Sequence, residues 1–135
     1  MANILFVYRE TENQGIEYLS AYLKQHGHSA ELVYEPSFLN NKYINSPAFR
    51  NLFPAEDIVA KVFRQRPLPD LIAFSTMTAD YQWSLSTSKR IKAINPDIPI
   101  IFGGIHPTLV PEETISDDSI DMVCIGEGEE ALLEL

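Results

Sequence analysis

The stretch ANILFVY, residues Ala2 to Tyr8, is a nearly continuous run of apolar side chains. A strand that is buried on both faces has this pattern, because helices cover both sides of a parallel sheet. Similar short runs recur later in the chain and predict four more strands, over Ala30 to Tyr34, Asp70 to Ser75, Ile98 to Phe102 and Asp121 to Ile125.

Amphipathic segments alternate with these runs. Apolar residues at helical spacing predict helices over Gly15 to Gln25, Ala55 to Gln65 and Tyr81 to Ile94, and Glu129 to Leu135 begins another. Thr78 or Asp80 is expected to cap the helix that starts at Tyr81. The segment from Phe38 to Pro54 breaks the rhythm and is interpreted as an insertion.

Alternating strands and helices predict an α/β fold with a parallel sheet between two helical layers. We expect a flavodoxin-like or Rossmann-like three-layer sandwich in which five strands take the order 2-1-3-4-5. The 135 residues make one domain, residues 1 to 135. In such folds ligands bind at the carboxyl ends of the strands, so function is sought in the loops that follow them.

Composition excludes several classes of protein. The net charge of −9 argues against a nucleic-acid-binding role, and residues 93 to 135 carry ten acids with no Lys or Arg. The single cysteine, Cys124, excludes an internal disulfide or a multi-cysteine metal site within this chain, and is expected in the core. No apolar run is long enough for a membrane span and no secretory signal is evident, so a cytoplasmic protein is expected.

The strand-end loops lack the usual ligands of this fold. The first, Arg9 to Gly15, has no glycine-rich phosphate turn. A receiver-like signalling domain is disfavoured because the third strand ends in Ser75, where such a domain needs an aspartate, and Gly126 follows the fifth strand in place of its lysine. A hydrolase using Glu127 with Glu10 or Glu12 is conceivable, but no general acid or base is marked out.

Three loops keep alternatives open. The hydroxyl-rich loop Ser75 to Thr78 either caps a helix or contacts a ligand. Gly103 and Gly104 permit a close approach to the backbone or a tight turn, and His106 with Pro107 is expected to form a rigid turn. In the loop and helix after Gly126, Glu129 and Glu130 need no functional explanation, because a helix dipole stabilises acids in a first helical turn.

Together these loops resemble a known family. PDIPIIFGGIHPTLVPEE (residues 96 to 113), IDMVCIGEGEEALLEL (120 to 135) and DLIAFSTMT (70 to 78) are similar to the N-terminal cobalamin-binding domain of B12-dependent radical S-adenosylmethionine (SAM) enzymes. Members include an anaerobic magnesium-protoporphyrin monomethyl ester cyclase and many methyltransferases. The resemblance covers essentially the whole chain.

The resemblance implies a cobalamin site. Its corrin ring would lie across the strand ends, and its nucleotide tail would pass between strands toward the core. Gly103 and Gly104 would leave space beside the tail, Ser75 would face the benzimidazole with Met77 nearby, and His106 and the Glu127 loop would line the ring edge. The complete set of implied cofactor-binding residues, with no catalytic residue or metal ligand among them, is Glu10, Thr11, Glu12, Asn13, Gly15, Ser75, Thr76, Met77, Thr78, Gly103, Gly104, Ile105, His106, Pro107, Gly126, Glu127 and Gly128.

One motif departs from the pattern of many B12 carriers, which place Asp-x-His-x-x-Gly after the first strand and ligate cobalt through its histidine. Here Glu10 to Gly15 occupies that stretch, and Glu12 stands where the histidine would be. The radical enzymes commonly lack the histidine, so the departure favours that subfamily.

The resemblance also implies partners. With one cysteine the chain cannot hold the CxxxCxxC motif of a 4Fe-4S cluster, so the cluster and S-adenosylmethionine would belong to a radical domain after Leu135. The chain is then expected to bind a corrinoid rather than catalyse, within a parent methyltransferase or oxidative cyclase. The alternative is a fold that has lost its cofactor and serves as an interaction or substrate-gating module. A homodimer of the truncated domain is a further expectation.

Overall fold

The computed structural model describes residues 1–9, 13–35, 48 and 56–135. Its centre is a five-stranded parallel sheet in the order β2-β1-β3-β4-β5, which confirms the predicted fold class and strand order. The strands are β1 (Asn3–Arg9), β2 (Ser29–Glu35), β3 (Leu71–Ser75), β4 (Ile100–Gly103) and β5 (Met122–Val123). The predicted insertion from Phe38 to Pro54 lies outside the described residues, except for Ala48.

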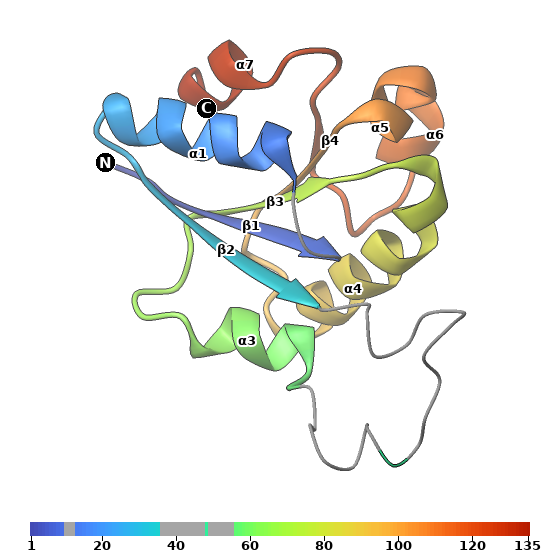
Figure 1. The fold of residues 1–135 in the computed structure, drawn as a ribbon. Helices are drawn as coiled ribbons and strands as arrows, with labels where there is room; N and C mark the ends of the chain where they lie inside the picture. Colours follow the sequence, from blue (N-terminus) through green and yellow to red (C-terminus); the bar gives the residue numbers. More distant parts are fainter. Residues whose placement is uncertain (10–12, 36–47, 49–55) are drawn as a thin grey trace.

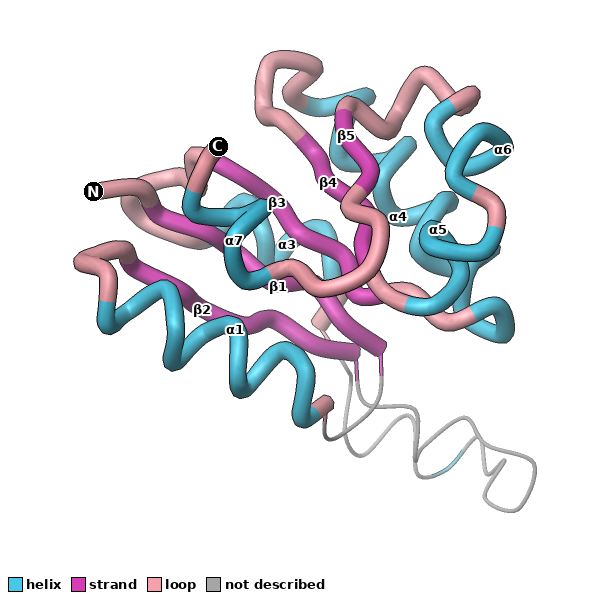
Figure 2. Tube along the Cα trace, turned by 90° about the horizontal axis from the view of Figure 1, so that it is seen from above, coloured by secondary structure: helices cyan, strands magenta, loops and turns pink. Residues whose placement is uncertain are grey.

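Helices cover both faces of the sheet. Figure 1 shows α1 (Gln14–Gln25) and α7 (Glu129–Leu133) on one face, and α3 (Ile58–Arg64) and α4 (Tyr81–Ile94) on the other. Figure 2, turned by 90°, agrees with this arrangement. Two short helices, α5 (Ile105–Leu109) and α6 (Pro111–Ile115), follow the carboxyl end of β4.

The two faces of the sheet carry separate cores because side chains alternate along each strand. Ile72 and Phe74 of β3 and Phe102 of β4 belong to the cluster on the α3–α4 face. Ala73 of β3 and Ile101 of β4 belong to the cluster on the α1–α7 face. At the centre of the sheet, the core on the α3–α4 face therefore has larger side chains than the core on the α1–α7 face.

The chain after β4 differs from the sequence prediction. His106 and Pro107 do not form an isolated turn; they lie in the first turn of α5. A proline fits there because the first N–H groups of a helix have no intrahelical partner to lose. The prediction of a rigid turn was therefore wrong.

The start of α4 also differs in detail. Thr78–Asp80 forms a short 3-10 helix before α4, and Asp80 occupies the N-cap position without a side-chain hydrogen bond. The Thr78 hydroxyl lies 3.3 Å from Nδ1 of His106, so it joins two strand-end loops and does not cap the helix.

Candidate functional site

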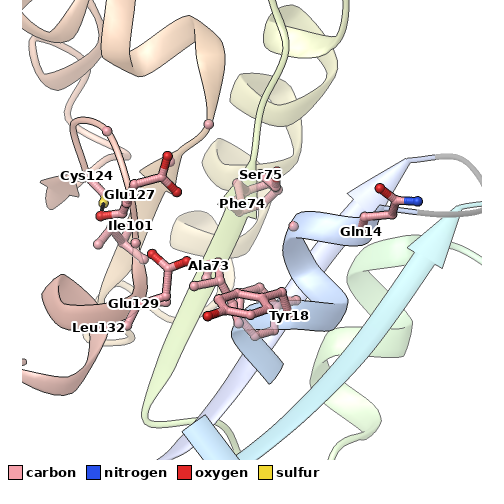
Figure 3. A pocket seen from close by; sticks show the side chains of 17 residues that line it. Gln14, Tyr18, Ala73, Phe74, Ser75, Ile101, Cys124, Glu127, Glu129 and Leu132 are labelled. Atoms are coloured by element: carbon pink, nitrogen blue, oxygen red, sulfur yellow. Dashed lines mark hydrogen bonds between the residues drawn. The ribbon is translucent and has the colours of Figure 1, made fainter. Parts of the chain in front are cut away.

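A cavity of about 380 Å³ lies at the carboxyl ends of the strands, between the sheet and helices α1 and α7. Figure 3 shows its lining. Its walls are mostly apolar, as in ligand sites generally. The cavity lies on the α1–α7 side of the sheet, whereas the family resemblance implied that the nucleotide tail would pass between strands. Its lining residues are Phe6, Gln14, Gly15, Tyr18, Leu19, Ala73, Phe74, Ser75, Ile101, Gly103, Gly104, Cys124, Gly126, Glu127, Gly128, Glu129 and Leu132.

The cavity exists because small residues occupy neighbouring strands on this face. Ala73 of β3, Gly103 of β4 and Cys124 after β5 line it together. A Cβ added at Gly103 would lie 3.6 Å from Cβ of Cys124, which is ordinary contact distance, so a side chain at residue 103 would extend beside Cys124. The missing Cβ at Gly103 thus leaves open space that a ligand can occupy.

Gly104 has a different role. Its φ is 99° and its ψ is −163°, a backbone conformation that is essentially restricted to glycine. A Cβ there would lie 2.9 Å from both the amide nitrogen and the carbonyl oxygen of Thr76. The chains approach closely because the Thr76 amide donates to the Gly103 carbonyl at 2.8 Å and the His106 amide donates to the Thr76 carbonyl at 3.1 Å. Chain packing alone therefore requires glycine at residue 104.

Asn13 connects the loops that follow β1 and β3. Its Oδ1 accepts a hydrogen bond from the Ile16 amide at 3.1 Å and so caps α1, while its Nδ2 donates to Oγ of Ser75 at 3.2 Å. Ser75 lines the cavity directly. The start of α1 is thus fixed relative to the cavity wall.

The structure brings seven of the predicted cofactor-binding residues to the cavity: Gly15, Ser75, Gly103, Gly104, Gly126, Glu127 and Gly128. Glu10, Thr11 and Glu12 lie outside the described residues. The other predicted residues stand apart from the lining. Thr76 is fully buried with its hydroxyl 3.5 Å from that of Ser84, whereas Met77 and Ile105 are exposed.

His106 is buried next to the cavity loops and does not line the cavity. Its ring stacks on Tyr81, with 4.0 Å between centroids, and its Nε2 has no hydrogen-bond partner within the described part of the chain. Pro107 is buried beside it in α5. The geometry places His106 between the loops after β3 and β4, where it packs them together.

Glu127 and Glu129 give the cavity its charge, and no Lys, Arg or His is among the lining residues of the described chain. Burial raises the pKa of the Cys124 thiol, and the carboxylates of Glu129 and Glu127 add to this effect. The thiol is therefore neutral at pH 7, and its Sγ donates to the Glu127 carbonyl at 3.7 Å.

Sequence reasoning missed most of the apolar lining. Phe6, Tyr18, Ala73, Ile101 and Leu132 line the cavity but were not among the predicted cofactor-binding residues. Cys124 was predicted as a core residue, and it is both buried and part of the cavity lining. The sequence feature that could have predicted this lining is the alternation of side chains along a strand, which places the small residues of β3 and β4 on the same face of the sheet.

The described residues contain no group of three or more His, Cys, Asp or Glu side chains that could hold a metal ion. No helix among them is both long and apolar enough to cross a membrane.

A parallel five-stranded sheet with an apolar cavity at the carboxyl ends of its strands defines the chain as a ligand-binding domain of the flavodoxin-like class. Within that class, residues 3–135 match the B12 binding domain, and the chain belongs to this family.

Named relatives agree with this assignment. The chain is 26% identical over 121 residues to the anaerobic magnesium-protoporphyrin IX monomethyl ester cyclase of Rubrivivax gelatinosus, covering 89% of this chain and 19% of the relative. It is 33% identical over 86 residues to an uncharacterized methyltransferase of Pyrococcus horikoshii, covering 60% of this chain and 18% of the relative. The chain thus spans about a fifth of the length of these relatives.

Among solved structures, a cobalamin-binding protein from Desulfitobacterium hafniense superimposes with a TM-score of 0.64 at 18% identity. The match covers 98% of this chain and 56% of that protein. At this identity the similarity shows a shared fold.

Proposed function

We propose that this chain binds a corrinoid, with the base of the nucleotide tail in the cavity and the corrin ring over the carboxyl ends of β1, β3 and β4. The observation that carries the proposal is the cavity wall made by Ala73, Gly103 and Cys124, where small residues on adjacent strands leave an apolar space. Membership of the B12 binding domain family supports the same ligand.

The residues present fit such a ligand. A flat aromatic base is apolar over most of its surface, and Phe6, Ile101 and Leu132 would contact its faces and edges. At the open end, Ser75 and Gln14 offer polar groups to the ribose and the linker. No histidine is among the described residues that line the cavity.

We further propose that the domain works as the B12-binding part of a longer radical SAM enzyme, either a methyltransferase or an oxidative cyclase. The names of the relatives, a cyclase and a methyltransferase, support this assignment. A bound corrinoid would supply a cobalt centre that passes on a methyl group or an electron. The 4Fe-4S cluster and S-adenosylmethionine would then belong to a downstream domain, which is the proposed partner of this chain.

The direct test is a titration of the chain with hydroxocobalamin, followed by desalting and an absorbance spectrum of the protein fraction. Gly103→Val adds a branched side chain beside Cys124, so we expect at least about tenfold weaker retention of cobalamin. Ala60→Val, on the exposed side of α3, is the matched control and should bind like the unmodified chain.

Circular dichroism and urea unfolding establish that each variant is folded, and Gly103→Ala replaces Gly103→Val if the larger side chain prevents folding. Equal retention of cobalamin by all folded variants would show that the nucleotide tail does not bind in the cavity. Absence of retention by the unmodified chain and by a longer protein that includes the downstream domain would overturn corrinoid binding. It would leave the alternative of an interaction module.

A further inference from the structure

We infer that the inner end of the cavity selects among corrinoids by the base of their tail and favours an apolar benzimidazole over a purine. The inference rests on the proposed function and adds a ligand specificity to it. It follows from which lining residues are buried and which polar groups they leave available.

The buried part of the lining is apolar. Phe6, Ala73, Ile101 and Leu132 have exposed fractions of 2%, 5%, 5% and 7%, so they form the closed end of the cavity. Tyr18, with an exposed fraction of 60%, lies at the open end together with the exposed Glu127. A base that enters the cavity therefore meets hydrocarbon at its far edge.

Cys124 is the one polar side chain among the buried lining residues of the described chain, and it already has a partner. Its thiol donates to the Glu127 carbonyl. The backbone beside the cavity is also paired, since Ala73 and Ile101 are aligned partners in the β3–β4 ladder. The closed end thus has few free groups to satisfy a polar edge of a base.

The carboxylates of Glu127 and Glu129 line the cavity without a lysine or arginine among the described lining residues. Like charges repel, so these groups disfavour the tail phosphate inside the cavity. The part of the tail that suits the interior is consequently its uncharged base.

The two common kinds of base differ at the edge that would meet the closed end. Dimethylbenzimidazole carries two methyl groups on its six-membered ring, whereas adenine carries ring nitrogens and an amino group there. A polar group buried without a hydrogen-bond partner costs binding free energy, whereas a buried methyl group gains it. We therefore expect the chain to bind dimethylbenzimidazolyl cobalamin about tenfold or more tightly than its adenine-containing counterpart.

The test compares dissociation constants for three corrinoids by absorbance titration: hydroxocobalamin, the adenine-tailed pseudocobalamin, and cobinamide, which lacks the nucleotide. Ala73→Ser places a hydroxyl at the closed end and should reduce the ratio between the first two corrinoids at least about threefold. Ala60→Ser, exposed on α3, is the matched control and should leave the ratio unchanged.

Equal binding of cobalamin and pseudocobalamin would overturn the specificity while leaving corrinoid binding intact. Cobinamide binding as tightly as cobalamin would overturn any role of the cavity in recognising the tail. Binding of none of the three corrinoids, either by this chain or by a longer protein that includes the downstream domain, would overturn the proposed function itself, so the two failures are distinguishable.

Discussion

The two faces of the sheet differ in how completely their side chains fill the space under the helices. On the α3–α4 face, Phe74 and Phe102 pack against each other with 4.8 Å between ring centroids, and Tyr81 meets Phe102 edge-on at 6.5 Å. On the α1–α7 face, the neighbouring residues Ala73 and Gly103 carry little or no side chain. One face is close-packed and the other encloses a cavity.

The same backbone makes both faces, because consecutive residues of a strand point to opposite sides. Phe74 and Phe102 are aligned partners on β3 and β4, and the next aligned pair is Ser75 with Gly103. A single step along each strand therefore separates a closely packed aromatic pair from the cavity wall. Stability and ligand binding are expected to depend on alternate residues of the same strands.

Phe102→Ala should have the largest effect on stability. Phe102 is fully buried on the filled face, so its truncation removes both buried apolar area and aromatic contacts. We expect a loss of about 3–5 kcal/mol in the free energy of unfolding, measured by urea titration. Ile94→Ala, at a largely exposed residue of α4, should cost less than about 0.5 kcal/mol. Similar costs for the two variants would show that this face is not close-packed.

Gly104→Ala and Gly103→Ala should distinguish a glycine that the backbone conformation requires from a glycine that leaves space in the cavity. At residue 104 a Cβ meets the Thr76 backbone and the backbone conformation disfavours other residues, so we expect a loss of about 2–4 kcal/mol. At residue 103 the added Cβ makes only ordinary contact, and unfolding should change by less than about 1 kcal/mol.

Urea titration of both alanine variants, with corrinoid titration of Gly103→Ala, measures the contrast. Equal destabilisation by the two variants would contradict the assignment of different roles to these adjacent glycines.

The smallest expected effect on stability is the pH dependence that arises from the Cys124 thiol. Because burial raises the pKa of its thiol, the folded protein holds the proton to a higher pH than the unfolded chain does. Its contribution to stability is therefore present below the ordinary thiol pKa of about 8.5 and declines as the pH rises toward the folded value. Iodoacetamide should modify the folded protein about tenfold or more slowly than the urea-unfolded chain at pH 8.

Saturating hydroxocobalamin should slow the modification of the folded protein further, because the ligand would occupy the cavity that Cys124 lines. Equal rates in the folded and unfolded states would show that the thiol is accessible to solvent.

The fold was predictable from sequence because long apolar runs and amphipathic helices determine it. The helix predicted over Tyr81 to Ile94 has those bounds, and the strand order is the predicted one. By contrast, α5 and α6 escaped prediction because each has only five residues, too few for a helical period to emerge.

The candidate site was only partly predictable for a related reason. Gly103 and Ser75 were recognisable because they follow strands, where ligands bind in this class of fold. Phe6 and Leu132 come from the middle of a strand and from a helix, and only the packing of α1 and α7 over the sheet brings them together. Gly104 was singled out in the sequence for a close approach to the backbone or a tight turn, but its positive φ and its contact with the Thr76 backbone required coordinates.

The small residues of the cavity wall also have an evolutionary consequence. Larger side chains at Ala73 or Gly103 could gain packing against the space that is now open, and filling a cavity commonly stabilises a protein. Without selection for a ligand, mutations that close the cavity would be neutral or favoured, and the lineage would drift toward a filled face. An open cavity maintained over many generations would therefore be a record of continuing selection for whatever occupies it.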